Sequence, residues 1–309
     1  MNINKPKFWD TKHQTFFSIF LLPISYFLQL LIFIKKFFIT KKKFNVPIIC
    51  VGNIYIGGTG KTPLAIKIFE FFKEKKNPVI IKKNYKNQKD EIELLNKYCK
   101  TILCKERSEG IKKAIEKKFD LIILDDGYQD LSFNKKLNII CFNTRQKIGN
   151  GQTIPAGPLR ENLASLKYCN IVLINGSKDL NFENKLKKSN SDLKFFYFKY
   201  FFEKIDQFKN KKLIAFAGIG NPDNFFSLMK EHHLNVVEEL SFPDHHDYTE
   251  KEIKNLFNLE EKYKAKLVTT EKDYLRISQY GRKRFGVLPI KIKFEDENKF
   301  IREVTEVIK

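Results

Sequence analysis

The sequence predicts an α/β protein with two α/β domains, of which the first carries a parallel sheet with helices on both faces. Short β-branched apolar runs alternate with segments of helical spacing, which is typical of parallel sheets covered by helices. The first run ends in a glycine-rich loop, and an uncharged apolar segment precedes it. With 309 residues the chain has room for about two domains. We expect an N-terminal membrane-associated helix at 1–40, a nucleotide-binding domain at 41–194, a connection at 195–208 and a smaller α/β domain at 209–309.

Composition and charge narrow the class of protein. Hydrophobic residues make up 42% of the chain, which is enough to bury sizeable cores. The net charge of +21 fits either an anionic partner surface or a general enrichment in lysine. The lysines are scattered without a compact stripe of interleaved aromatics, so we expect no nucleic-acid partner. The 5 cysteines form no C-x-x-C pair, which argues against a disulfide scaffold or a zinc site.

The apolar segment runs from Phe16 to Ile34 without a formal charge. A bilayer-spanning helix needs about 20 apolar residues, and Pro23 and Gln29 interrupt this one. Lysines flank both ends and are denser after the run, so the following domain should be cytoplasmic. We expect a membrane-inserted or interfacial helix, with a buried core helix as the alternative.

The elements that follow alternate in type. Strands are expected at 47–54, 78–83, 101–104, 119–130, 137–143 and 169–176, and helices at 62–75, 90–99 and 108–118, the last with Ser108 as N-cap. A polar surface excursion should cover 177–194, and 194–205 should form a connecting strand or hairpin. A second alternating unit begins at 211–231 and continues through 266–277 and 286–294. Ligands are expected beyond the carboxyl ends of the parallel strands.

A near match to the phosphate-loop pattern G-x-x-x-x-G-K-[ST] follows the first strand, with Tyr55 in the place of the first glycine. The glycines let backbone amides approach phosphate oxygens at the start of a helix. The lysine can neutralise phosphate charge, and the threonine can ligate Mg²⁺. A purely structural glycine-rich turn is the alternative. The residues predicted to bind nucleotide here are Gly57, Gly58, Thr59, Gly60, Lys61 and Thr62.

Three further segments carry side chains that could take part in binding or catalysis. Asp125 and Asp126 end an apolar strand and could hold Mg²⁺ or close an Asx turn. His245 lies in "DHH" beside an aspartate and could act as, or pair with, a general base, or simply add surface polarity. Arg160 in "PAGPLRE" could clamp a phosphate or lie on a surface loop.

Several motifs occur in a characteristic order: "VGNIYIGGTGKTP", "DDGYQ", "GNGQTIPAGPLRE", "AFAGIGNPDNFF", "FPDHH" and "TEKD". Together they resemble tetraacyldisaccharide 4'-kinase, the lipid A kinase of Gram-negative bacteria. The resemblance extends from the apolar segment to at least residue 273. The family's loop, G-N-x-x-x-G-G-[TS]-G-K-[TS], also lacks the first glycine, so Tyr55 is not a defect.

The resemblance implies a kinase that uses ATP and Mg²⁺. It would transfer the γ-phosphate to the 4'-hydroxyl of a tetraacylated glucosamine disaccharide 1-phosphate, forming lipid IVA. The enzyme would then work at the cytoplasmic face of the bacterial inner membrane, where its anionic lipid substrate lies. The acyl-chain preference and the oligomeric state stay open.

The family's functional residues map onto this chain by motif. Asp90 matches the aspartate of the family's G-D-E-P segment, the expected base for the sugar hydroxyl. His245 matches the histidine that pairs with this aspartate across the interdomain cleft. The phosphate and metal side of the site would comprise Lys61, Thr62, Asp125, Asp126, Gln129, Arg160 and Glu161, with Gln129 near the nucleotide and Glu161 near the metal.

The chain departs from the family around Asp90. The family has S-R-G-Y-G where this chain has Lys82-Lys83-Asn84-Tyr85-Lys86, and the segment from there to Asp90 is shortened. Lys89, Ile92 and Asp130 also replace the family's Gly, Pro and His. These changes fit either an altered acceptor or drift.

Two alternatives come from other classes. A phosphate-loop GTPase should carry N-K-x-D, of which "GSKD" at 176–179 is a loose echo. A basic membrane- or RNA-binding module would bind RNA in a salt-sensitive way without binding nucleotide.

Overall fold

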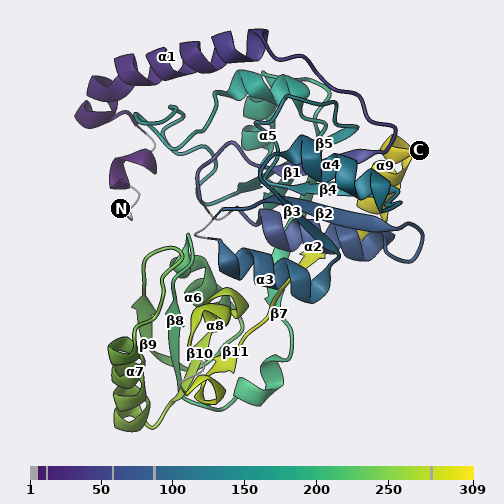
Figure 1. Ribbon diagram of the computed structural model, residues 1–309. Coiled ribbons are helices and arrows are strands. Elements are labelled where there is room, and N and C mark those ends of the chain that lie inside the picture. Colours follow the sequence, from purple (N-terminus) through teal and green to yellow (C-terminus); the bar gives the residue numbers. More distant parts are fainter. Residues whose placement is uncertain (1–5, 12, 58, 86–87, 279–280) are drawn as a thin grey trace. The chain divides into compact units, whose positions relative to one another are not determined.

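The computed structural model describes residues 6–309 except 12, 58, 86–87 and 279–280 (Figure 1). The chain divides into two compact units, which we treat separately. The core unit comprises residues 6–84, Cys99–Lys199 and Lys293–Lys309, and the small unit comprises Tyr85–Tyr98 and Tyr200–Ile292.

Within the described residues, the core unit is built on an eight-stranded sheet in the order β12-β7-β6-β5-β1-β4-β2-β3. The recorded pairings from β3 to β7 are all parallel, so the carboxyl ends of these strands share one edge. The loop after β1 and the carboxylate that ends β4 therefore lie at the same edge. The strands are β1 (Ile48–Gly52), β2 (Pro78–Lys83), β3 (Thr101–Cys104), β4 (Leu121–Asp125), β5 (Leu137–Asn143), β6 (Ile171–Asn175), β7 (Lys194–Phe202) and β12 (Ile290–Phe294).

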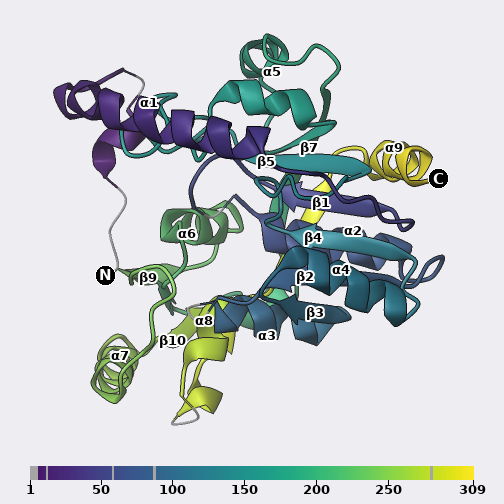
Figure 2. The ribbon, with the colours of Figure 1, turned by 45° about the horizontal axis from the view of Figure 1, so that its top comes forward.

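Helices cover both faces of this sheet (Figure 2). On one face, Ile111 of α4 (Arg107–Glu116) and Leu186 of α5 (Leu180–Lys187) pack in one cluster with Cys50 and Leu124. On the other, Phe71 of α2 (Lys61–Phe72) lies 6.3 Å, between ring centroids, from Phe300 of α9 (Glu297–Ile308). The strands are buried on both faces, which is why they read as continuous apolar runs. Short 3-10 helices lie at Lys7–Trp9 and Leu163–Tyr168.

The small unit has its own four-stranded parallel sheet, in the order β11-β10-β8-β9. Buried side chains of α6 and α7 cover its two faces in separate clusters. Helices α3 and α8 contact each other. The elements are α3 (Lys89–Tyr98), β8 (Leu213–Ala217), α6 (Pro222–Glu231), β9 (Val236–Ser241), α7 (Glu250–Tyr263), β10 (Lys266–Thr269), α8 (Glu271–Arg276) and β11 (Gly286–Val287), with 3-10 turns at Ile205–Phe208 and Arg282–Arg284.

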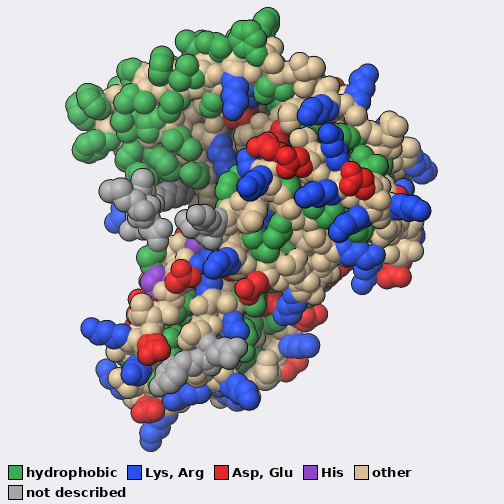
Figure 3. Space-filling view, in the orientation of Figure 1, with side chains coloured by type: hydrophobic (Ala, Val, Ile, Leu, Met, Phe, Trp, Pro, Cys, Tyr) green, Lys and Arg blue, Asp and Glu red, His purple; other side chains and the backbone are tan. Residues whose placement is uncertain are grey.

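Helix α1 (Phe16–Phe37) belongs to the core unit and touches it along one narrow polar face. Ser18 donates to the carbonyl of Ala156 at 2.8 Å, and Ser25 donates to that of Thr153 at 2.9 Å. These serines, one heptad apart, are the helix's buried residues. Most of the remaining surface is apolar and exposed, so the alternative of a buried core helix is wrong. Figure 3 shows the hydrophobic side chains gathered over α1.

Several expectations differ from the structure. The N-cap of α4 is Glu106 rather than Ser108, since the helix begins at Arg107. The expected surface excursion at 177–194 contains α5, whose N-cap Asp179 accepts a bond from the amide of Phe182 at 3.0 Å.

The division into units also differs from the expected boundaries. Residues Tyr85–Tyr98 group with the small unit because α3 packs on α8, and Lys293–Lys309 group with the core unit because α9 packs on its sheet.

Candidate active site

The phosphate loop connects β1 to α2 in the core unit. Gly57 and Gly60 adopt φ angles of 107° and 87°, which are strained for residues with a side chain. Asn53 supports the loop, because its side-chain amide Nδ2 donates to Thr59 Oγ1 at 2.9 Å. Gln129 in turn donates to the carbonyl of Asn53 at 2.9 Å. The loop therefore has the backbone conformation and the support expected of a phosphate-binding loop at the N-terminus of a helix.

Tyr55 has a structural task in place of the missing glycine. Its ring is 1% exposed and belongs to the core-unit hydrophobic cluster. Its backbone forms a β-bridge with Leu159, and the neighbouring Ile56 amide donates to the carbonyl of Pro158 at 2.9 Å. The same segment also brings in Arg160, whose amide donates to the carbonyl of Ile54 at 2.7 Å. Tyr55 thus ties the loop to the segment that carries Arg160.

Asp125 is the centre of one group of contacts. Thr62 Oγ1 donates to Asp125 Oδ2 at 3.1 Å, and Lys82 Nζ donates to the same oxygen at 2.8 Å. Asp125 and Lys82 are 1% and 3% exposed. Their proximity follows from the sheet, because Lys82 is the register partner of Asp125 on the neighbouring strand β2. Asp125 Oδ1 is buried and has no hydrogen-bond partner among the described residues.

Asp126, the next residue, is held by other cations. Arg160 Nη1 contacts both carboxylate oxygens, at 2.9 and 3.1 Å, and Lys61 Nζ lies 3.7 Å from Oδ2. Burial would raise the pKa of Asp126, but the charges of Lys61 and Arg160 outweigh burial and lower it. Asp126 is therefore ionised and places the two cations beside the loop.

The residues present fit a Mg²⁺ ion. Because the Thr62 hydroxyl donates its proton to Asp125, an oxygen lone pair is left for a metal, and the unpartnered Asp125 Oδ1 is a ready acceptor for a metal-bound water. No group of three or more His, Cys, Asp or Glu side chains arranged for a metal occurs in the described ranges. A site of this kind would thus draw its other ligands from phosphate and water, as Mg²⁺ sites commonly do.

The remaining predicted residues of this side are placed as follows. Glu161 is 5% exposed, and its Oε2 pairs with Lys36 of α1 at 2.8 Å rather than with the group around Thr62. Gln129 supports the loop indirectly, through its hydrogen bond to the carbonyl of Asn53. Gly58, also expected to bind nucleotide, lies outside the described residues.

A second group of predicted site residues lies within the small unit. Asp90, at the start of α3, is 3% exposed. His245 Nδ1 lies 3.2 and 3.3 Å from its two carboxylate oxygens, and Arg276 Nη2 donates to Oδ1 at 2.7 Å. Asp90 and His245, which were expected to meet from different domains, belong to the same unit because α3 is part of it. The neighbouring His246 points elsewhere and contacts Glu252 at 3.0 Å.

These contacts set the protonation states of the pair. Burial would raise the pKa of Asp90, but hydrogen bonds from His245 and Arg276 outweigh it and hold that pKa well below its usual range. The hydrogen bond to Asp90 raises the pKa of His245 above 6.5, against the opposing effect of burial. Asp90 is therefore ionised and oriented by two donors, and His245 gains a proton more readily than a free imidazole.

The sequence alone missed Lys82, Arg276 and Asn53 as members of these groups. Lys82 had one signal, a lysine within an apolar strand that pairs with the strand of Asp125. Arg276 had none, because it reaches Asp90 only through the contact between α8 and α3.

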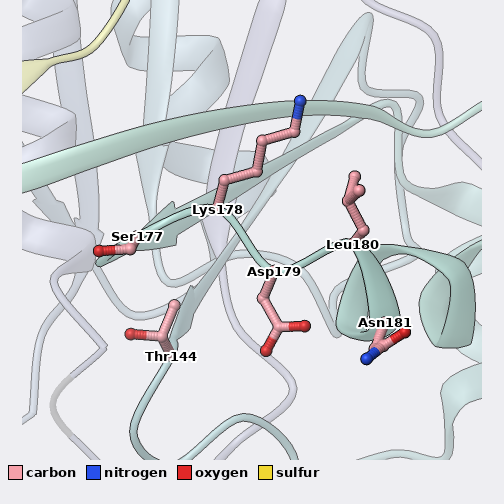
Figure 4. A pocket seen from close by; sticks show the side chains of 6 residues that line it. All are labelled: Thr144, Ser177, Lys178, Asp179, Leu180 and Asn181. Carbon is pink, nitrogen blue, oxygen red and sulfur yellow. The ribbon is translucent and has the colours of Figure 1, made fainter.

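A cavity of about 620 Å³ lies at the carboxyl ends of β5 and β6 (Figure 4). It contains "GSKD", the loose echo of a guanine-reading motif. Both oxygens of Asp179 are engaged, since Oδ1 caps α5 and Oδ2 pairs with Lys147 at 2.5 Å. A guanine-reading aspartate needs a free carboxylate for the base, so this geometry argues against the GTPase alternative.

Comparisons with known proteins agree with the motifs. A sequence profile of the family described as Tetraacyldisaccharide-1-P 4'-kinase matches residues 17–309. The chain is 40% identical to the tetraacyldisaccharide 4'-kinase of Pelagibacter ubique over 98% of each chain. It is 32% identical to that of Rickettsia bellii over 88% of this chain and 89% of the relative. The crystal structure of LpxK from Aquifex aeolicus in complex with ATP matches 94% of this chain and 99% of its own, with 26% identity and a TM-score of 0.70. The chain belongs to the tetraacyldisaccharide-1-P 4'-kinase family.

Proposed function

We propose that this chain transfers the γ-phosphate of ATP to the 4'-hydroxyl of a tetraacylated glucosamine disaccharide 1-phosphate, which yields lipid IVA. As a member of its family the chain is a kinase. The observation that carries the proposal is that one chain holds two sets of side chains. The core unit has a phosphate loop with the Thr62–Asp125 contact, and the small unit has an oriented carboxylate, Asp90. The first set suits a nucleoside triphosphate and the second suits a hydroxyl acceptor.

The core unit would bind ATP. The loop amides would hold the phosphates, and Lys61 would exchange part of its contact with Asp126 for phosphate oxygens. Thr62 and Asp125 would hold Mg²⁺, which supplies charge neutralisation for the phosphates when bound. Arg160, already beside Asp126, would stabilise charge that develops on the moving phosphoryl group. Gln129 would support the loop through Asn53. Glu161 would act near the metal only by exchanging its contact with Lys36 for one on the metal side of the site.

The small unit would handle the acceptor. Asp90 would accept a hydrogen bond from the 4'-hydroxyl and take its proton as the new bond to phosphorus forms. Its lowered pKa makes it a weak base in this state, which suits phosphoryl transfer, because that reaction demands orientation of the nucleophile more than early proton removal. His245 would keep Asp90 in place and share the proton afterwards.

The acceptor is a lipid, and helix α1 provides a means of reaching it. By length and composition α1 could cross a membrane, and Phe16, Phe20 and Phe37 are 79%, 71% and 82% exposed. Its polar face remains bound to the segment that carries Arg160. We therefore place the chain at the cytoplasmic face of the bacterial inner membrane, with α1 in contact with lipid.

The test is transfer of labelled phosphate from γ-labelled ATP to the tetraacyl disaccharide 1-phosphate in detergent micelles. We expect transfer by the wild type, loss in Asp90→Asn, and full activity in Asp223→Asn, an exposed aspartate of the same unit. Transfer by Asp90→Asn at the wild-type rate would move the base elsewhere. Binding of ATP without any transfer would mean that the changes between residues 82 and 92 have altered the acceptor.

A further inference from the structure

Lys82 occupies an unusual place for a lysine. It lies in β2 with 3% of its surface exposed, and its ammonium group pairs with Asp125. A buried lysine is costly unless it is paired, so this contact holds the side chain in place. The carboxylate that it neutralises is the same one that accepts the hydroxyl proton of Thr62. Lys82 thus contacts the group that would support a divalent cation.

The charge balance around the loop is positive. Among the described ion pairs, Lys61 and Arg160 face Asp126, while Lys82 faces Asp125. Lys82 also contributes to lowering the pKa of Asp126, so its positive charge acts on Asp126 as well as on its ion-pair partner Asp125. Cations therefore outnumber carboxylates before any nucleotide arrives. Such a site attracts a bare triphosphate and holds an added cation less tightly than the same site would without Lys82.

We propose that Lys82 is a positioning residue that takes over part of the electrostatic task of the divalent cation. Its ammonium neutralises Asp125 and supplies fixed positive charge at the phosphate site, so this chain binds ATP with a weak dependence on Mg²⁺. The proposal rests on the proposed ATP site.

The position of Lys82 affects both the affinity for a divalent cation and the affinity for metal-free ATP. Replacement by serine would remove the ammonium group from Asp125, with Thr62 still bound to Oδ2. That pair would then attract a divalent cation more strongly, because a competing positive charge within hydrogen-bond distance has gone. The same replacement would lower the positive charge that acts on a bare triphosphate in the loop. Affinity for the cation should therefore rise, while affinity for metal-free ATP should fall.

The experiment measures ATP affinity by calorimetry in EDTA and in saturating Mg²⁺, and Mn²⁺ affinity in the absence of nucleotide by electron paramagnetic resonance. For Lys82→Ser we expect ATP binding in EDTA to weaken roughly tenfold relative to the wild type, and Mn²⁺ binding to tighten roughly tenfold. Lys82→Arg should stay close to the wild type, because it retains the charge. Lys112→Ser, an exposed lysine of α4, controls for the change in net charge.

Lys82→Met separates charge from packing, because it fills a similar volume without an ammonium group. It should behave as Lys82→Ser does in both measurements, and added Mg²⁺ should raise its Tm more than it raises the wild-type Tm. If the ratio of ATP affinities in Mg²⁺ and EDTA is the same in wild type, Lys82→Ser and Lys82→Met, the proposal fails while the ATP site stands. If the folded wild type binds no ATP in either condition, the proposed function fails with it.

Discussion

Arg276→Gln tests how the small unit holds Asp90, the carboxylate proposed as the catalytic base. The substitution removes the guanidinium that donates to Asp90 Oδ1 at 2.7 Å, while His245 remains at 3.2 Å. The Arg276 side chain is 7% exposed and that of Asp90 is 3% exposed, so the pair is buried. Removing one partner of a buried ion pair costs about 3–5 kcal/mol. Since His245 still contacts Asp90, we expect the lower end, about 3 kcal/mol.

The loss should depend on pH in a definite direction. His245 has a pKa above 6.5 in the folded chain, so its contribution to stability is present below pH 6.5 and is lost as pH rises through the raised pKa. Asp90 has a lowered pKa, and its contribution disappears only in strong acid. In Arg276→Gln, His245 is the remaining hydrogen-bond donor to Asp90 among the contacts described above. The variant should therefore lose more stability than the wild type does as pH rises from below 6.5 through the raised pKa of His245.

Hydrogen exchange measured by mass spectrometry on peptides from α3 and α8 gives the local free energy of opening, without assuming a single unfolding transition. The double variant with His245→Asn should remove the added pH dependence. The account would be refuted if Arg276→Gln lowered the free energy of local opening by less than about 1 kcal/mol. It would also be refuted if the loss were equal below and above the raised pKa of His245.

Three further outcomes are expected. Lys61→Ala should lower phosphate transfer roughly a hundredfold or more and weaken ATP binding, because the loop loses its phosphate charge; wild-type turnover would refute the loop assignment. His245→Ala should lower kcat roughly tenfold to a hundredfold with little change in ATP affinity, since His245 acts on Asp90 in the small unit; an unchanged kcat would exclude it from the mechanism. Deleting residues 1–40 should release the protein from membranes into the soluble fraction on centrifugation; retention would point to a second lipid-binding surface.

The sequence by itself determined the fold class, and it predicted the residues that we propose for the phosphate side of the site. Strands β2, β3 and β5 occupy the ranges that their apolar patterns predicted, because strands buried on both faces leave continuous apolar runs. The loop and the Asp125–Asp126 pair were also visible, since each lies within a few consecutive residues at the end of a strand. Local motifs of this kind need only a strand, a turn and a helix in order.

Only the tertiary structure decided which side chains act together. The contact between Lys82 and Asp125 depends on the register of two strands far apart in sequence. The grouping of Asp90 with His245 and Arg276 depends on α3 packing within the small unit, although the chain on both sides of α3 belongs to the core unit. Such contacts arise from the order of strands and the packing of helices, which periodicity does not encode. The sequence therefore indicated the chemistry of single residues, but it did not indicate which charged side chains surround each of them.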